Sequence, residues 1–256
     1  MLKIDIIPAL EDNYIYFLED EATGKTAIVD PGDAKPVLDY LSKHDKPLDY
    51  ILNTHHHWDH TNGNKKLKSK FPKAQLVAFK GDAHRIKDID IEVEEGASFA
   101  IGEAEAEILE VPGHTSGHIA FHFPASMALF CGDTLFSLGC GKMFEGTAEQ
   151  MWMSLCKLRA LPENTQVYCG HEYTYKNGGF CLNIEPENGF LHRRLVGVKR
   201  LRDAGRPSVP SLMGIEKKTN VFLRADHPDL LENLPLEDKG DPIAVFAYLR
   251  EQKDQY

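Results

Sequence analysis

Short apolar runs separated by turn-forming residues fill the first two thirds of the chain. Runs at 2–7, 14–18 and 26–30 predict β-strands, because turn signals such as Glu11-Asp12-Asn13 and Asp30-Pro31-Gly32 bound them. Further strands are predicted at 48–53, 75–79, 105–111, 119–123, 127–131 and 166–169. After residue 171 the strand signals stop.

Helical signals accompany these strands and then replace them. Asp33 is a good N-cap for a helix to about residue 43, and Thr147 with Gln150 has the capping-box spacing for a helix over 147–160. Further helices are predicted at 62–71, 191–202 and 241–253. The pattern therefore predicts an α/β (α+β) fold, with sheets covered by helices to about residue 170 and a helical region after it.

Composition narrows the class of protein without identifying it. No apolar run approaches the ~20 residues that a membrane span needs, and the formal net charge of −10 disfavours nucleic acid as a partner. Lys3, inside the first apolar run, argues against a secretory signal. Five scattered cysteines without a Cys-x-x-Cys pair argue for reduced thiols. We expect a cytoplasmic protein with no nucleic-acid and no membrane partner, and a monomer as the simplest oligomeric state.

The stretch from Thr54 to Gly63 carries the strongest chemical signal. Residues 55–60 include four histidines and an aspartate, directly after a predicted buried strand. An extended backbone turns alternate side chains to one face, so His55 and His57 point the same way. Where the chain turns into a helix, Asp59 and His60 face a neighbouring position. This spacing predicts two metal positions rather than a solvated polar loop.

Three further candidate ligands stand where later strands end. His114, Asp133 and His171 each follow a glycine, which lets the backbone approach closely. Each motif alone is weak, because a single Gly-Asp-Thr is more often a turn. Together and in this order they predict a complete ligand set. Asp133 is the natural bridging ligand, because one carboxylate gives an oxygen to each of two metals.

The order of these motifs resembles the metallo-β-lactamase superfamily and, within it, the glyoxalase II (hydroxyacylglutathione hydrolase) family. The resemblance extends over nearly the whole chain, through the stretches 12–14, 139–147, 171–174, 221–224 and 250–254. It implies a metallo-β-lactamase αββα sandwich as the catalytic domain over 1–172. It also implies a helical, glutathione-binding C-terminal domain over 173–256.

The resemblance also assigns the metal ligands. It implies that one metal is held by His55, His57 and His114, and the other by Asp59, His60 and His171, with Asp133 bridging. His56 is then the non-ligand of the histidine triplet, and His118 has a structural or orienting role. The cofactor is expected to be two divalent metal ions, zinc first, with iron or manganese as alternatives, because imidazole and carboxylate suit all three.

The substrate implied is a small molecule, the thioester S-D-lactoylglutathione. In the family, cationic and tyrosine side chains bind the glutathione moiety, and the matching residues here are Lys142, Tyr173, Arg250 and Lys253. Arg250 and Lys253 are three apart on a predicted helix and share a face. Two departures stand out: Phe144 where some members have tyrosine, and Gly178-Gly179 where larger residues are expected.

The implied reaction yields D-lactate and glutathione, the second step of methylglyoxal detoxification. A hydroxide bridging the metals and oriented by Asp59 would attack the thioester carbonyl, so neither Ser116 nor Cys140 is needed as a nucleophile. One alternative is a mononuclear iron persulfide dioxygenase of the same fold, with the second metal site empty. The other is a non-catalytic metal-binding module. Metal analysis, oxygen uptake and a thioester hydrolysis assay distinguish the three.

Overall fold

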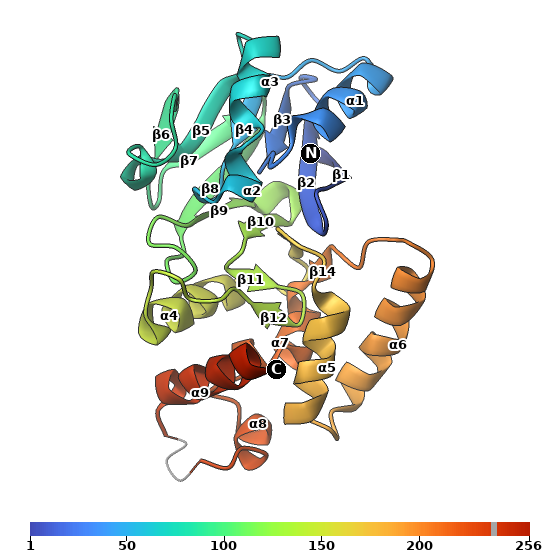
Figure 1. Ribbon diagram of the computed structural model, residues 1–256, viewed down its shortest axis with the longest axis vertical. Coiled ribbons are helices and arrows are strands. Elements are labelled where there is room, and N and C mark those ends of the chain that lie inside the picture. The colour runs from blue at the N-terminus through green and yellow to red at the C-terminus, as the bar shows by residue number, and fades with distance from the viewer. Residues whose placement is uncertain (237–239) are drawn as a thin grey trace. The chain divides into compact units, whose positions relative to one another are not determined.

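The computed structural model describes residues 1–236 and 240–256 (Figure 1). The chain divides into two compact units, each discontinuous in sequence. The first unit contains Met1–Glu110 and Gly117–Gly132, and the second contains Val111–Ser116 and Asp133–Tyr256. Each unit thus carries part of the predicted ligand set.

The first unit is built on a six-stranded sheet in the order β1-β2-β3-β4-β5-β6. The first three strands pair antiparallel, and β3 to β6 pair parallel. The parallel edge directs the C-terminal ends of β3 and β4 to the same side, where the predicted histidine loop begins. The strands are β1 Leu2–Ala9, β2 Asn13–Asp20, β3 Thr26–Val29, β4 Tyr50–Leu52, β5 Gln75–Phe79 and β6 Ile91–Val93.

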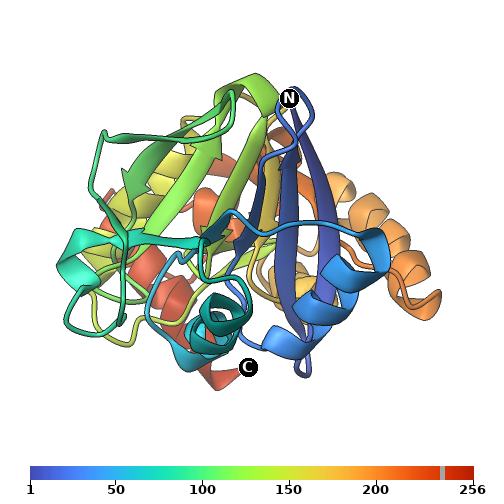
Figure 2. The ribbon, with the colours of Figure 1, turned by 90° about the horizontal axis from the view of Figure 1, so that it is seen from above.

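One face of this sheet is covered by helices α1 (Ala34–His44) and α3 (Asn64–Lys70), which lie side by side (Figure 2). Their apolar residues, among them Val37 and Leu67, share one buried cluster with the strand residues Phe17 and Ile51. The predicted cap is present, because the Asp33 side chain accepts a hydrogen bond from the Lys35 N–H at 2.9 Å.

The other face packs against a second group of antiparallel strands in the same unit. The rings of Tyr16 and Phe130 meet edge to face at 5.4 Å, and those of Tyr50 and Phe99 at 5.1 Å. Such contacts join the two sheet faces in one apolar core. These strands are β7 Ser98–Ile101, β8 Ala104–Glu110, β9 Ile119–Phe123 and β10 Ala128–Gly132.

The second unit is mainly helical and contains two short strand pairs, β11 with β12 and β13 with β14. The predicted capping box is confirmed, since Thr147 and Gln150 bond each other's backbone N–H. The elements are β11 Leu135–Phe136, β12 Gly139–Cys140, α4 Ala148–Arg159, β13 Gln166–Cys169, α5 Thr174–Ile184, α6 Gly189–Asp203, β14 Ser211–Leu212, α7 Met213–Thr219, α8 Pro228–Glu232 and α9 Pro242–Gln255. Single turns of 3₁₀-helix lie at Lys80–Asp82, Pro124–Ser126 and Val221–Leu223.

Aromatic packing holds these helices together. Phe222 meets Phe180 of α5 at 5.8 Å and Phe246 of α9 at 6.1 Å, and Phe246 meets Trp152 of α4 at 6.2 Å. Gly178 is required here rather than disruptive, because a Cβ at this position would lie 2.1 Å from the Leu195 side chain of α6. Helix α5 therefore continues through the glycine pair, and the loss of helix propensity is the cost of close α5–α6 packing.

The observed elements match the predicted α/β pattern, but helix α5 and the shortest elements were not predicted. Strands β6, β7, β11, β12 and β14 and helices α7 and α8 have too few residues to show a period in the sequence. Within the described residues, no helix is long and apolar enough to cross a membrane.

Candidate metal centre

The histidine loop leaves β4 and enters the short helix α2 (Trp58–Thr61) under tight restraint. The Asn53 side chain is fully buried, donates to the His60 carbonyl at 3.0 Å and accepts from Asn64 at 2.6 Å. The His55 Nε2 and His57 Nδ1 atoms lie 3.1 Å apart, as alternation along an extended strand predicts. Two nitrogen ligands of one tetrahedral zinc, at Zn–N of about 2.05 Å, are separated by about 3.3 Å. The pair therefore fits one ion.

Asp30, at the end of β3, orients the next histidine and was missed by the sequence reasoning. Its carboxylate accepts from the Thr54 N–H at 2.8 Å and the Thr54 hydroxyl at 2.7 Å, and it lies 3.0 Å from His60 Nδ1. A donated Nδ1–H turns Nε2 outward as the ligand atom. Asp30, His55 and His60 form one cluster of metal-ligand type, in which Asp30 already accepts several bonds. It is therefore better suited to orienting His60 than to binding metal directly.

Asp30→Asn is expected to weaken metal affinity about 10- to 100-fold, because the amide no longer fixes the His60 tautomer. Competition with a graded series of chelators measures the affinity. Asp33→Asn is the matched control, since asparagine caps a helix as well as aspartate does. Equal affinities for both variants would show that Asp30 has no orienting role.

Asp59 is fixed through both its backbone and its side chain. The Asn13 side chain donates to the Asp59 carbonyl at 3.2 Å and to its carboxylate at 3.1 Å. Gly32 permits the close approach of the two segments, because a Cβ there would lie 1.8 Å from the Asp59 carbonyl oxygen. His60 Nε2 lies 3.5 Å from the Asp59 carboxylate. Asp59 and His60 thus present donor atoms to one position.

His56 points elsewhere, as alternation predicts. Its Nδ1 lies 3.4 Å from the buried carboxylate of Asp82, which also pairs with Arg85. Gly117 packs directly on this carboxylate, and a Cβ there would lie 1.9 Å from it. His56 therefore belongs to a structural ion-pair cluster. His118 is also structural, because its ring stacks on His55 at 4.6 Å and 16°.

His56→Ala is expected to keep both metals at saturating metal, because its ring faces Asp82. Metal analysis of the purified, reconstituted variant checks this. His57→Ala is the comparison, one residue along, and is expected to lose bound metal. Loss of a metal from His56→Ala would mean that the loop was interpreted in the wrong register.

In the second unit, Asp133 lies between two histidines. One of its carboxylate oxygens, Oδ2, is 3.5 Å from His114 Nε2 and 3.3 Å from His171 Nε2. All three side chains are buried. The Nδ1 of His114 lies 2.7 Å from the Lys142 carbonyl, so a proton there turns Nε2 toward the carboxylate. Two buried imidazoles converging on one carboxylate fit a metal-binding role.

Close backbone approach supports this cluster too. A Cβ on Gly141 would lie 1.9 Å from the Asp133 carbonyl oxygen, so the position requires glycine. The His171 ring stacks on Tyr173 at 4.9 Å and 2°, which fixes its orientation. The exposed Phe144 meets the His114 ring edge to face at 5.3 Å. Phe144 therefore supports His114 through ring contact and has no hydroxyl to offer a substrate.

The predicted glutathione-binding cations differ in exposure. Lys142 is exposed. Arg250 is buried, donates to the Cys140 carbonyl at 3.0 Å and pairs with Asp254 at 2.8 Å. Lys253 lies over the rings of Phe180 and Tyr256, at 5.4 and 4.9 Å. Of these two residues on α9, Lys253 has the charge that is more available to a ligand, because Arg250 is bonded to Cys140 and Asp254.

Neither side chain considered as a nucleophile suits that role. Burial raises the pKa of the Cys140 thiol to about 11, so it is protonated at neutral pH. The Ser116 hydroxyl donates to the Glu145 carboxylate at 2.8 Å. Ser116 is therefore engaged in fixing its loop, and the clustered histidines and aspartates are the candidates for the reactive centre.

Comparison with known proteins covers the whole chain. The metallo-beta-lactamase superfamily matches residues 10–171, and the hydroxyacylglutathione hydrolase C-terminus matches residues 172–256. The chain is 51% identical over 255 residues to a hydroxyacylglutathione hydrolase of Rhodospirillum rubrum, covering 100% of this chain and 99% of that one. It is 49% identical over 256 residues to one of Methylococcus capsulatus, with the same coverage.

Solved structures agree on the fold. ETHE1 from Myxococcus xanthus is similar with a TM-score of 0.70 and 23% identity, over 99% of this chain and 91% of that one. TTHA1623 in a di-iron-bound form is similar with a TM-score of 0.56 and 25% identity, over 66% of this chain and 91% of that one. The predicted α/β sandwich with a helical C-terminal region is thereby confirmed.

Proposed function

This chain belongs to the hydroxyacylglutathione hydrolase family of the metallo-β-lactamase superfamily, and on that premise we propose that it hydrolyses S-D-lactoylglutathione to D-lactate and glutathione. The observation that carries the proposal is a sequence identity of 51% and 49% to two such hydrolases over 100% of this chain. Histidine–aspartate clusters of metal-ligand type support it. A direct assay follows thioester loss and glutathione release by the metal-reconstituted protein. If the protein neither consumed the thioester nor released glutathione, the proposal would be overturned.

We propose that the chain binds two metal ions through the ligand set that the family resemblance implies. His55, His57 and His114 would hold one ion, Asp59, His60 and His171 the other, with Asp133 bridging them. The support is chemical: zinc takes four or five donors, and neither unit's own candidates make two complete sets. Zinc is our first assignment, with iron or manganese as alternatives for the same imidazole and carboxylate donors. Metal analysis paired with activity identifies the ion.

The chain's own residues then have separate roles in the reaction. Bound divalent ions supply an acidified water and polarise the thioester carbonyl. Asp59, held by Asn13, would orient the attacking water. The water oxygen bonds to the thioester carbon and the C–S bond breaks. One proton of the water ends on the sulfur of the departing glutathione, and the other is released when the carboxyl group of D-lactate ionises. Orienting Asp59 before the substrate arrives lowers the entropic cost of the attack.

We assign recognition of the anionic glutathione moiety to Lys142, Tyr173, Arg250 and Lys253. Support comes from the backbone run that links them. The Cys140 carbonyl accepts from Arg250, and two residues on, the Lys142 carbonyl lies against His114. A chain with net charge −10 that gathers cations near such a run favours an anionic ligand there. The functional domains would be 1–172 for catalysis and 173–256 for glutathione binding.

Lys253→Ala and Arg250→Ala are each expected to raise KM for the thioester about 5- to 50-fold and to leave metal content intact, because each removes a charge-assisted bond. Arg250→Ala should also lower thermal stability, since Arg250 is buried and bonded to Cys140. Steady-state kinetics with metal analysis measures the effect. An unchanged KM in both variants would remove α9 from the binding site.

The pH dependence of KM provides a separate prediction. Burial, and then the charges of Arg250 and Lys176, lower the pKa of Lys253 from 10.5 to about 8. A lysine is charged below its pKa, so KM for the anionic thioester is expected to rise as pH increases through about 8. The Lys253→Ala variant should lack this rise, and a rise that persists there would trace to another group.

Two further assignments are proposals of the same kind. We propose a cytoplasmic location, supported by the cysteines, none of which forms a disulfide among the described residues. We propose a monomer, which light scattering coupled to size-exclusion chromatography tests.

The persulfide dioxygenase alternative predicts one iron per chain and oxygen uptake with glutathione persulfide. Whole-chain identity to hydrolases near 50% favours the thioester reaction.

A further inference from the structure

Lys176, on the first turn of α5, belongs to a cluster of cations. One helical turn further on, Phe180 shares the same face of α5. The Lys253 ammonium of α9 lies over this Phe180 ring, 5.4 Å from its centre. The residue pair Lys176–Phe180 thus brings the two lysines to one patch, and Arg250 lies one turn earlier on α9.

A groove gives the second geometric link. It has a volume of about 670 Å³, lies along α5 and α6, and is lined by both Lys176 and Tyr256. The Tyr256 ring is the other aromatic ring that Lys253 contacts, at 4.9 Å from its centre. Lys176 therefore lines the groove, and Lys253 lies over the ring of a residue that lines it too.

Neither of the two lysines forms an ion pair with a residue that the structure describes. Within residues 1–236 and 240–256, neither Lys176 nor Lys253 has a carboxylate oxygen within 4.0 Å, although Asp254 pairs with Arg250. The mutual effect of the cations is visible in Lys253, whose pKa the charges of Arg250 and Lys176 help to lower. Cations gathered without partners destabilise the free protein, and an anionic ligand relieves that repulsion.

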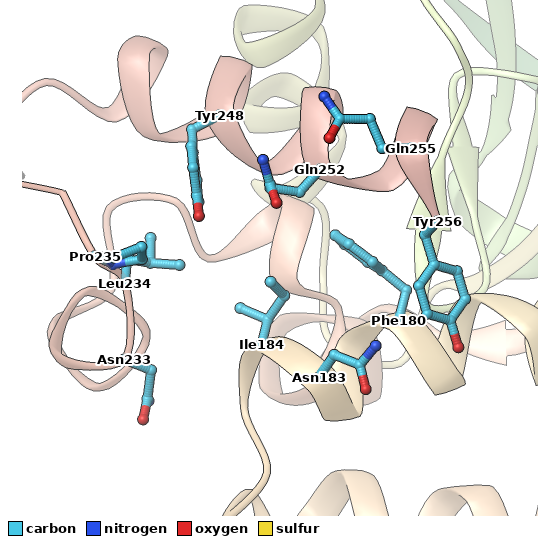
Figure 3. A pocket seen from close by; sticks show the side chains of 10 residues that line it. All are labelled: Phe180, Asn183, Ile184, Asn233, Leu234, Pro235, Tyr248, Gln252, Gln255 and Tyr256. Carbon is cyan, nitrogen blue, oxygen red and sulfur yellow. The ribbon is translucent and has the colours of Figure 1, made fainter.

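A neighbouring pocket lacks this chemistry. It has a volume of about 410 Å³, and both Phe180 and Tyr256 line it (Figure 3). Its polar side chains come from residues such as Asn183, Tyr248 and Gln252, and none of its described lining residues is charged. An anionic group therefore has its counter-charge beside Lys176 and Lys253, and not in this pocket.

We propose that Lys176 acts with Lys253 as a carboxylate-binding pair for one of the two carboxylates of the glutathione moiety. The inference rests on the proposed function and adds to it a specificity residue, Lys176. Lys176 is exposed, so it adds one more cation to those already assigned to the glutathione moiety.

The test measures KM and the affinity for free glutathione in Lys176→Met. Methionine is a good helix former, so the fold is expected to persist, and a thermal melt verifies it. KM for S-D-lactoylglutathione and the glutathione Kd should each rise about fivefold, while kcat changes little. Lys176→Arg should restore both. Lys199→Met is the matched control, because Lys199 lines the same groove but is bonded to Asp203 at 2.8 Å.

Substrate variants then identify the contact. S-D-lactoylglutathione is prepared with each carboxylate converted in turn to a neutral amide. One of the two amide substrates lacks the carboxylate that the lysine pair binds. With that substrate, the KM values of Lys176→Met and Lys253→Met should equal the KM of the wild-type protein. Equal effects of Lys176→Met on all three thioesters, or none, would overturn the inference. If the wild-type protein fails to hydrolyse the parent thioester, the proposed function fails instead.

Discussion

Asp133→Ala is expected to lose both metals, or to retain them so weakly that kcat falls roughly a thousandfold or more. The reason is that one carboxylate would serve two ions, and its removal also leaves His114 and His171 without the buried group on which both converge. Metal analysis after reconstitution and hydrolysis of S-D-lactoylglutathione measure the two effects together.

The control for this substitution is Asp203→Ala, which removes an exposed carboxylate paired with Lys199 in the same unit. It should keep both metals and full activity. An Asp133→Ala protein that is active with two bound metals would rule out the bridging assignment. Loss of only one metal would assign Asp133 to a single ion.

Removing the glutathione moiety is expected to cost far more than changing the acyl group. A lactoyl thioester of a small uncharged thiol would lose the contacts proposed for Lys142, Arg250 and Lys253, and each charge-assisted bond contributes about 1.5–3 kcal/mol. We expect kcat/KM to fall about a hundredfold or more, and kcat to fall with it, because remote binding energy positions the carbonyl.

The measurement compares kcat/KM for S-D-lactoylglutathione, a second acylglutathione and the small uncharged thioester. The kcat/KM for the second acylglutathione should stay within about tenfold of that for S-D-lactoylglutathione, because a pocket discriminates only weakly between acyl groups of similar size. Phe144 donates no hydroxyl, so KM for both acylglutathiones should be high for the family. Equal efficiency with the small thioester would contradict both the cationic site and the proposed function.

The local sequence determined much of the candidate centre. Alternation along a strand predicted that His55 and His57 point together while His56 points elsewhere, because side chains of an extended chain have a period of two. The capping box at Thr147 was likewise readable, since both its members lie within four residues. Apolar runs bounded by turns predicted the longer strands for the same reason: their signals are local.

Only the tertiary structure decided which distant groups fix these residues. Asp30 meets His60 and Asn13 meets Asp59 across 30 and 46 residues, and no local period reports such pairs. Gly178 stands where a larger residue was expected from the sequence, and it permits the close contact of α5 with Leu195. Lys176 belongs to no sequence motif. Its proposed role became visible only from the packing of α9 on α5, where Lys253 lies over the Phe180 ring. Periodicity is encoded between neighbours in the chain, whereas burial, orientation and charge balance depend on residues that folding brings together.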